Sequence, residues 1–240
     1  MNFIKNLIDP HRLLLVWKDS KTDKGKEFVI GEIKKACNGN IVFKYLINPN
    51  KCDESTKHNI KPYPAFPDFD KIYQHNVLDT FSMRLPPRKR NDFKQFLISI
   101  RIPPETQISD FALLGYSRAT LPGDNFSILH PFEQVNEPFE FITEIDFIEN
   151  NGYTIDDIEI EKEVSFQFEI LNGLNSIYVE YNQHKIGYIK QLQTSIFSRI
   201  KDANVKGVIE KKSKMRNRVF VFVSSGIRGK KLNPRLASNN

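Results

Sequence analysis

The sequence predicts an α+β N-terminal domain, built from a short antiparallel meander plus helices, followed by a small β-barrel with one main helix. Short β-rich runs open the chain, apolar residues at helical spacing mark its middle, and period-2 strands return around one amphipathic helix near its end. A length of 240 residues accommodates two domains. We place them at 1–135 and 136–225, with a basic tail over 226–240 that we expect to be flexible.

Three short β-rich runs predict the opening meander: Arg12–Lys18, Glu27–Lys34 and Asn40–Ile47. Turn residues separate them. Between the second and third runs, Cys37–Asn40 contains Asn-Gly, which tolerates the positive φ of a type I′ hairpin. Residues 48–67 contain four prolines and many polar groups, so we expect an irregular loop there.

The middle of the chain predicts helices. A short helix is expected over 68–79, with Phe69, Ile72 and Tyr73 on one face. Asn91 is the expected N-cap of a helix that runs to Arg101. Finally, Ser109 is the expected cap of a helix through Phe111, Leu113 and Leu114, and Phe126–Leu129 is the expected last strand of this domain.

At residues 134–138 the sequence turns polar and its charge changes sign, which is why the domain boundary is placed there. Apolar residues at every fourth position predict a helix over 190–202. Around this helix, alternating residues predict five or six strands and therefore a small, partly open barrel. The expected strands are Phe139–Ile148, Val164–Leu171, Ser176–Tyr181, Lys185–Ile189, Val205–Ile209 and Arg218–Val223.

The charge distribution is uneven. Residues 136–180 carry 12 acidic side chains and one Lys, a net charge of −11, whereas residues 181–240 carry 14 basic and two acidic side chains, a net charge of +12. These blocks either pair with one another inside a small domain, or present a basic face to phosphates and an acidic face elsewhere.

Several function classes find no support in the sequence. It has no apolar run of the roughly 20 residues that a membrane span needs, and no signal peptide, so a cytoplasmic protein is expected. Phosphate-binding loops and hydrolase or metalloprotease motifs are also missing. Cys37 and Cys52 lack the paired spacing typical of zinc ligands. We therefore expect no catalysis, no cofactor, no metal and no small-molecule substrate.

The C-terminal half resembles the HIRAN domain family. Asn175–Val179 matches an Asn-Ala-Ile-x-Val run of that family, and Lys185–Ile189 matches the strand that follows, with its Ile-Gly-Tyr-Ile core. The similarity covers 139–225. It implies an OB-like barrel. In helicase-like chromatin remodellers such a module binds the 3′ end of single-stranded DNA, and in bacteria it also occurs in small stand-alone proteins.

This chain departs from the family at the DNA-end pocket. Asn172-Gly173 stands where the family has Tyr-Asp, and Asp146 stands where DNA-binding members place Arg. Phe147 is expected to stack on a base, and Lys190 to contact a phosphate. The resemblance therefore implies the fold more directly than it implies the pocket.

The N-terminal half resembles the small, non-catalytic N-terminal lobe of HipA-type toxin kinases. The resemblance rests on the three strands, a Leu-Pro segment, and Phe111–Gly115 followed by a glycine-containing turn. In some toxin–antitoxin systems a separate polypeptide of this kind binds and restrains the kinase. The alternative is an unrelated α+β domain.

Two functions follow. In the first, the basic barrel binds single-stranded DNA or DNA ends, through stacking and phosphate contacts. In the second, the chain is an antitoxin-like or regulatory subunit that docks on a HipA-type kinase by protein–protein contacts. The residues expected to bind nucleic acid are Phe147, Asn175, Lys185, Tyr188, Lys190, Arg199, Lys211, Lys212, Lys214, Arg216 and Arg218. Those expected to bind a protein partner are Arg84, Arg88, Lys89 and Arg90.

Overall fold

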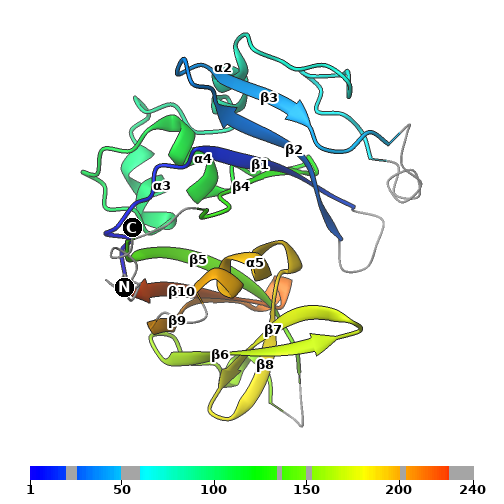
Figure 1. The fold of residues 1–240 in the computed structure, drawn as a ribbon. Helices are drawn as coiled ribbons and strands as arrows, with labels where there is room; N and C mark the ends of the chain where they lie inside the picture. Colours follow the sequence, from blue (N-terminus) through cyan, green and yellow to red (C-terminus); the bar gives the residue numbers. More distant parts are fainter. Residues whose placement is uncertain (20–25, 50–59, 134–136, 150–152, 201–203, 227–240) are drawn as a thin grey trace, which may run out of the picture.

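A computed structural model describes residues 1–19, 26–49, 60–133, 137–149, 153–200 and 204–226. It contains an open four-stranded antiparallel sheet and a closed six-stranded antiparallel barrel, with few helices (Figure 1). We call the sheet with its helices α2–α4 the sheet unit, and the closed strands with helix α5 the barrel. The predicted flexible tail lies almost wholly outside the described residues.

The sheet has the strand order β3-β2-β1-β4. The first three strands are the predicted meander: β1 (Arg12–Lys18), β2 (Glu27–Lys35) and β3 (Ile41–Tyr45). The last, β4 (Phe126–Leu129), returns from more than 100 residues away to pair with β1, with Leu15 opposite Ile128. Non-local pairing of this kind closes the sheet unit around a single core.

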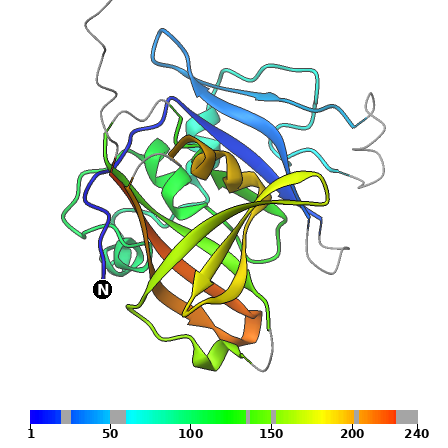
Figure 2. The same cartoon turned by 60° about the horizontal axis from the view of Figure 1, so that its bottom comes forward.

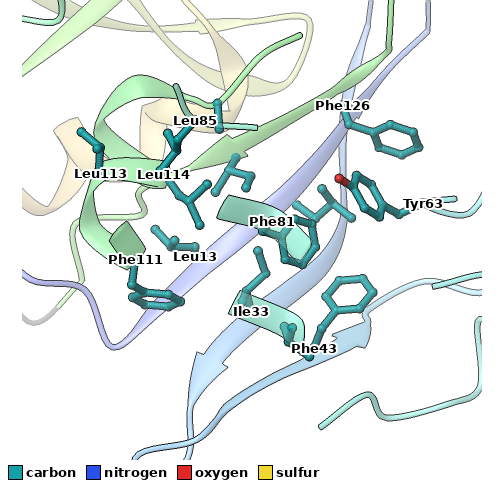
Figure 3. Close-up of a cluster of buried hydrophobic side chains, with 14 of the residues drawn as sticks. Leu13, Ile33, Phe43, Tyr63, Phe81, Leu85, Phe111, Leu113, Leu114 and Phe126 are labelled. Atoms are coloured by element: carbon teal, nitrogen blue, oxygen red, sulfur yellow. The ribbon is translucent and has the colours of Figure 1, made fainter. Parts of the chain in front are cut away.

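Three short helices cover the sheet: α2 (Val77–Ser82), α3 (Phe93–Ser99) and α4 (Asp110–Ser117). Their apolar side chains meet those of β1–β3 in one cluster (Figure 3). At its aromatic end, Phe43 packs edge-on against Phe81, with ring centroids 5.5 Å apart. Ser109 caps α4 as predicted, because its hydroxyl accepts a hydrogen bond from the Ala112 N–H at 3.0 Å.

Three local predictions in this unit were wrong. The helix predicted over 68–79 begins only at Val77, as α2, because the backbone of Tyr73 pairs with that of Phe43 and draws the preceding residues alongside β3. Asn91 is not a cap, since α3 starts after Asp92. The Asn-Gly turn is shifted by one residue: Gly39 alone has a positive φ, of 81°, and its N–H bonds to the Ala36 carbonyl, which is incompatible with type I′.

The barrel strands run in the order β10-β5-β8-β7-β6-β9, and β9 pairs back to β10 (Figure 2). Every predicted strand is present. Val219, Val221 and Val223 of β10 illustrate the period-2 pattern, because all three are fully buried inside the barrel. The strands are β5 (Phe139–Phe147), β6 (Glu163–Leu171), β7 (Leu174–Tyr181), β8 (His184–Ile189), β9 (Asn204–Ser213) and β10 (Arg218–Gly226).

The barrel closes, where the sequence predicted a partly open one. The closure is narrow on one side, however. Strand β6 pairs with β9 at two positions only, Glu163 with Val208 and Val164 with Gly207. The other side of β6 pairs with β7 over seven positions, from Ser165 to Leu171. The β6–β9 seam therefore has the fewest paired residues of any strand pair in the barrel.

Helix α5 (Gln191–Ile200) lies on the side of the barrel that faces the sheet (Figure 1). It buries Ile196, Phe197 and Ile200 of the predicted apolar stripe. Just before it, Gly187 of the Ile-Gly-Tyr-Ile motif lies against β5. A Cβ at this position would be 2.4 Å from the Asp146 carbonyl oxygen, so only glycine allows the two backbones to approach so closely.

The two units share a contact surface. Phe222, on the outside of β10, is buried in the core of the sheet unit, and Ile142 of β5 packs beside it. The N-terminal segment also joins the units: the N–H of Asn6 bonds to Glu140 of β5, and that of Ile8 bonds to the Tyr116 hydroxyl of α4. In the part of the chain described, no helix is long and apolar enough to cross a membrane.

Candidate functional site, a basic cleft between sheet and barrel

A hollow that the described residues enclose lies between the sheet unit and the barrel. It has a volume of about 370 Å³, within the range typical of ligand sites. Seven basic and four acidic side chains line it, a net charge of +3. The charged residues are Lys18, Glu27, Arg101, Arg118, Asp124, Glu144, Lys190, Glu210, Lys211, Arg216 and Arg218, and Tyr116, Phe126 and Phe220 add aromatic rings. We call this the interdomain cleft.

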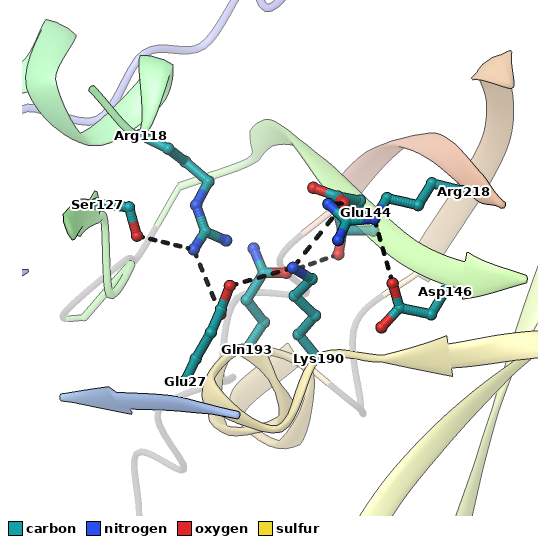
Figure 4. A network of polar contacts seen from close by, with 9 residues as sticks. Glu27, Arg118, Ser127, Glu144, Asp146, Lys190, Gln193 and Arg218 are labelled. Atoms are coloured by element: carbon teal, nitrogen blue, oxygen red, sulfur yellow. Dashed lines mark hydrogen bonds and ion pairs between the residues drawn. The ribbon is translucent and has the colours of Figure 1, made fainter. Parts of the chain in front are cut away.

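A chain of ion pairs crosses the cleft (Figure 4). Glu27 at the start of β2 accepts from Lys190 of the barrel at 3.1 Å, and its other oxygen lies 3.5 Å from Arg118 at the end of α4. Lys190 is also 3.9 Å from Glu144 of β5. Burial raises the pKa of Glu27, but Arg118 and Lys190 outweigh that effect and hold the pKa below its ordinary value. Glu27 is therefore ionised at neutral pH, and it joins the two units.

The basic charge is not fully neutralised. Arg118, Lys190 and Arg218 face carboxylates, and Arg101 pairs with the buried Glu210 at 2.8 Å. By contrast, Lys18, Lys211 and Arg216 have no carboxylate within ion-pair distance among the residues described. Lys211 instead lies over the Phe220 ring, 5.8 Å from its centroid. A cation on an aromatic face, in the same cleft as two further cations without carboxylate partners among the described residues, favours an anionic ligand with a flat ring.

The structure brings four of the eleven residues predicted to bind nucleic acid into this cleft: Lys190, Lys211, Arg216 and Arg218. Lys190 lies between β8 and α5, and the other three residues belong to the β9–β10 hairpin. Lys190 and Arg218 are held by carboxylates, so their free charge is reduced. Lys211 and Arg216 are exposed at the cleft and are the strongest candidates for phosphate contacts.

The other predicted residues lie elsewhere and have structural contacts. Phe147 was expected to stack on a base, but it is only 5 % exposed in the barrel core, because it occupies an inward position of β5. Lys212 donates to three backbone carbonyls, at 2.7–3.1 Å, where a single helical turn ends at Ile158. Arg199 donates to the carbonyl of Pro131. Lys214 pairs with Asp156.

Lys185 and Tyr188 form a compact group on the outside of the barrel. Both bond to Glu169, at 2.8 Å and 2.5 Å respectively, and the Lys185 ammonium lies 4.4 Å from the centroids of Tyr178 and Tyr188. Asn175 is exposed near the tip of the β6–β7 hairpin. None of these three lines the interdomain cleft.

Asn172 and Gly173, the departures from the HIRAN pocket, form the tip of the β6–β7 hairpin. Their φ angles are 51° and 77°, and Leu171 pairs with Leu174 across a two-residue loop. These are the features of a type I′ turn, which explains why Asn-Gly stands there. Asp146, the other departure, is exposed and lies 3.4 Å from Arg218, so it reduces the charge of a cleft residue.

Arg84 was predicted to bind a protein partner, but it is 6 % exposed and belongs to the fold. Its guanidinium donates to the carbonyls of Ala119 and Phe126 and pairs with Asp124 at 2.5 Å. Arg88 pairs with Asp110, and Arg90 with Asp92. Among these four residues, Lys89 alone is an exposed cation with no ion pair to the described part of the chain.

Sequence reasoning missed the sheet-unit side of the cleft: Lys18, Glu27, Arg101 and Arg118. No local signal marked them, because they are scattered over 100 residues and meet only when the chain folds and β4 pairs with β1. The described residues contain no group of three His, Cys, Asp or Glu side chains that could hold a metal ion. Cys52, the second cysteine of the chain, lies outside the described residues.

No protein-family model matches this chain, and comparisons with curated proteins and with solved structures found no match either.

Proposed function

We propose that this chain is a non-catalytic, HIRAN-type binding protein that holds single-stranded DNA or a DNA end in the interdomain cleft. In this proposal the barrel is OB-like, and the ligand lies between it and the sheet unit. One observation carries the proposal. Three cations without carboxylate partners among the described residues, Lys18, Lys211 and Arg216, surround a cleft of about 370 Å³ that also contains aromatic rings.

The chemistry of the cleft suits a nucleic acid better than a simple anion. Phosphates would meet the unpaired cations, while Phe220 offers apolar ring surface for a base. Because the cations sit on both units, binding would also hold the units together. This differs from the family's DNA-end pocket, whose Tyr-Asp is replaced here by a hairpin turn.

Fluorescence anisotropy with a labelled single-stranded oligonucleotide tests the proposal. Each neutralised phosphate releases counterions, so affinity should fall steeply between about 50 and 200 mM salt. The double variant Lys211→Ala/Arg216→Ala should bind at least about tenfold more weakly, and its salt slope should fall by about two.

Lys214→Ala is the matched control, because Lys214 lies in the same β9–β10 hairpin but pairs with Asp156 outside the cleft. It should bind like the wild-type protein. Equal binding by the double variant and the control would reject the cleft as the site. Millimolar, salt-insensitive binding by the wild-type protein would reject nucleic-acid binding altogether.

Docking on a HipA-type kinase, within a toxin–antitoxin or defence system, is the second candidate. The exposed Lys89 and the apolar tip of the β6–β7 hairpin favour a protein contact of some kind. Co-purification with the product of a neighbouring kinase gene, lost in a Lys89→Glu variant, is the expected result. Recovery of nucleic acid alone would count against this candidate.

A further inference from the structure

Strand β6 has one edge that no strand of the described structure covers along most of its length; we call it the free edge. The strand pairs with β9 only at Glu163 and Val164, and from Ser165 to Leu171 its one partner in the described structure is β7. Seven consecutive residues therefore leave one side of their backbone unpaired within the described chain. Such an edge is a template for a further strand, and proteins usually protect it with charges, prolines or a covering segment.

The direction of the backbone groups along this edge can be derived. Ile209 of β9 donates its N–H to the carbonyl of Lys162 at 2.8 Å, so even-numbered residues of this strand face the β9 side. The ladder with β7 has no register shift, and the alternation continues to the hairpin tip. Phe166, Phe168 and Ile170 therefore direct their N–H and C=O groups at the free edge.

The side chains of this edge are unusually apolar for an exposed strand. Phe168 is 49 % exposed and Ile170 is 75 % exposed, on the face that continues the barrel interior, and Leu171 and Leu174 are exposed at the tip. Beside them, where β6 and β9 diverge, lies a second hollow of about 370 Å³ that Phe166 and Phe197 line. Within the free stretch, Glu169 is the one charged residue.

We propose that a second copy of this chain occupies the edge, with the two β6 strands antiparallel and the twofold axis at Phe168. Phe168 is the midpoint of the free stretch, so all seven residues find a partner: Ser165 faces Leu171, Phe166 faces Ile170, and Gln167 faces Glu169. Apolar residues meet apolar ones on one face, and the single carboxylate meets an amide that can donate to it.

Neighbouring registers are less favourable. An axis at Gln167 would place Ile170 opposite Val164, whose edge is already paired with Gly207. An axis at Glu169 would bring two carboxylates together. An axis between two residues would set apolar side chains opposite polar ones. The charge pattern and the length of the edge thus select the same register. Because the two chains are related by a twofold axis, each edge is fully occupied by the other, and the assembly stops at a dimer instead of growing into a fibre.

Cysteine cross-linking tests this register directly. Ser165 and Leu171 are exposed, and at the free edge they form non-hydrogen-bonded pairs, with Cα atoms about 4.5 Å apart, which a disulfide can span. In a background with Cys37→Ser and Cys52→Ser, a mixture of the Ser165→Cys and Leu171→Cys chains should form a disulfide-linked dimer under mild oxidation. Each chain alone should not, because like positions lie far apart.

Light scattering of the full chain supplies an independent measurement. The wild-type protein should show a concentration-dependent dimer, and Ile170→Lys should remain monomeric with unchanged circular dichroism. The matched control is Met215→Lys, an exposed apolar residue at the far end of the β9–β10 hairpin, which should dimerise like the wild-type protein. A wild-type monomer at all concentrations, or a mixture that does not cross-link, would overturn the proposal.

Discussion

At the scale of single residues, Arg84 shows how a basic side chain that looks available in the sequence is used by the fold. Its side chain is 2 % exposed and satisfies two backbone carbonyls and one carboxylate. Arg84→Ala should lower the free energy of unfolding by about 3 kcal/mol, because it removes the cation paired with Asp124 and the donor to both buried carbonyls. Urea unfolding measures this. Lys89→Ala, five residues away and exposed, should change it by less than about 0.5 kcal/mol.

His130 predicts a pH dependence. It is 2 % exposed, its Nε2 lies 3.2 Å from the Ile8 carbonyl, and its Nδ1 accepts the Phe132 N–H at 2.9 Å. Burial lowers the pKa of His130 from 6.5 to about 4. In the unfolded chain His130 therefore binds a proton below about pH 6.5, whereas in the folded chain it does so only below about pH 4. Folded-state stability is full above pH 6.5 and falls as the pH drops, by up to about 3 kcal/mol.

The measurement is urea unfolding at several pH values between 7.5 and 4.5. His130→Asn removes the titrating ring and should flatten the loss of stability in this window, although it lowers stability at pH 7.5. His11→Asn is the control, since His11 is exposed, and it should retain the wild-type slope. If His130→Asn keeps that slope as well, the acid sensitivity arises from other groups.

At the scale of elements, two hairpin turns of the barrel have the same length but differ in whether a glycine occupies the second position. Asn172-Gly173 joins β6 to β7, and Asn182-Gln183 joins β7 to β8 with φ angles of 47° and 65°. Both are two-residue loops that need positive φ at each position. Gln183 carries a strain that glycine would relieve.

Gly173→Ala should therefore destabilise the barrel by about 1 kcal/mol, and Gln183→Gly should stabilise it by a similar amount. No atom lies within 4 Å of a Cβ at Gly173, so the first effect would come from the backbone alone. Thermal unfolding of the two variants checks the signs. Effects of the same sign would mean that the turns do not control the hairpins in this way.

At the scale of the whole molecule, Glu27 links the sheet unit to the barrel and also occupies two cations of the cleft. Glu27→Gln keeps the shape of the side chain but removes its charge. If the cleft binds nucleic acid, this variant should bind a single-stranded oligonucleotide about fivefold more tightly, because Arg118 and Lys190 become available to phosphates. Anisotropy measures the affinity, and unfolding experiments should show a loss of stability. Unchanged or weaker binding by a folded variant would place the ligand elsewhere.

The barrel strands were predictable because the pattern of apolar and polar residues that predicts each one lies within a single short segment. The alternation of β10 and the apolar stripe of α5 can be read within ten residues. The cleft was not predictable, since Lys18, Arg118 and Arg216 come from three distant segments and no pattern connects them. The prediction for Phe147 was wrong for a different reason: the residue lies on the same face of β5 as Phe139 and Phe141, so the alternation already placed its ring in the core. The closed β6–β9 seam depends on two residue pairs, too few to leave a periodic signal.

The N-terminal segment has a consequence for the order in which the chain can assemble during synthesis. The Asn2 side chain donates to Glu210 of β9 at 3.1 Å, and the Ile4 N–H bonds to the carbonyl of Arg101. Domains generally fold as they leave the ribosome, N-terminal residues first. Ile4 can find its partner once Arg101 has been made, but the Asn2 side chain can reach Glu210 only after β9 has been translated. The contacts of this one segment therefore form in at least two stages.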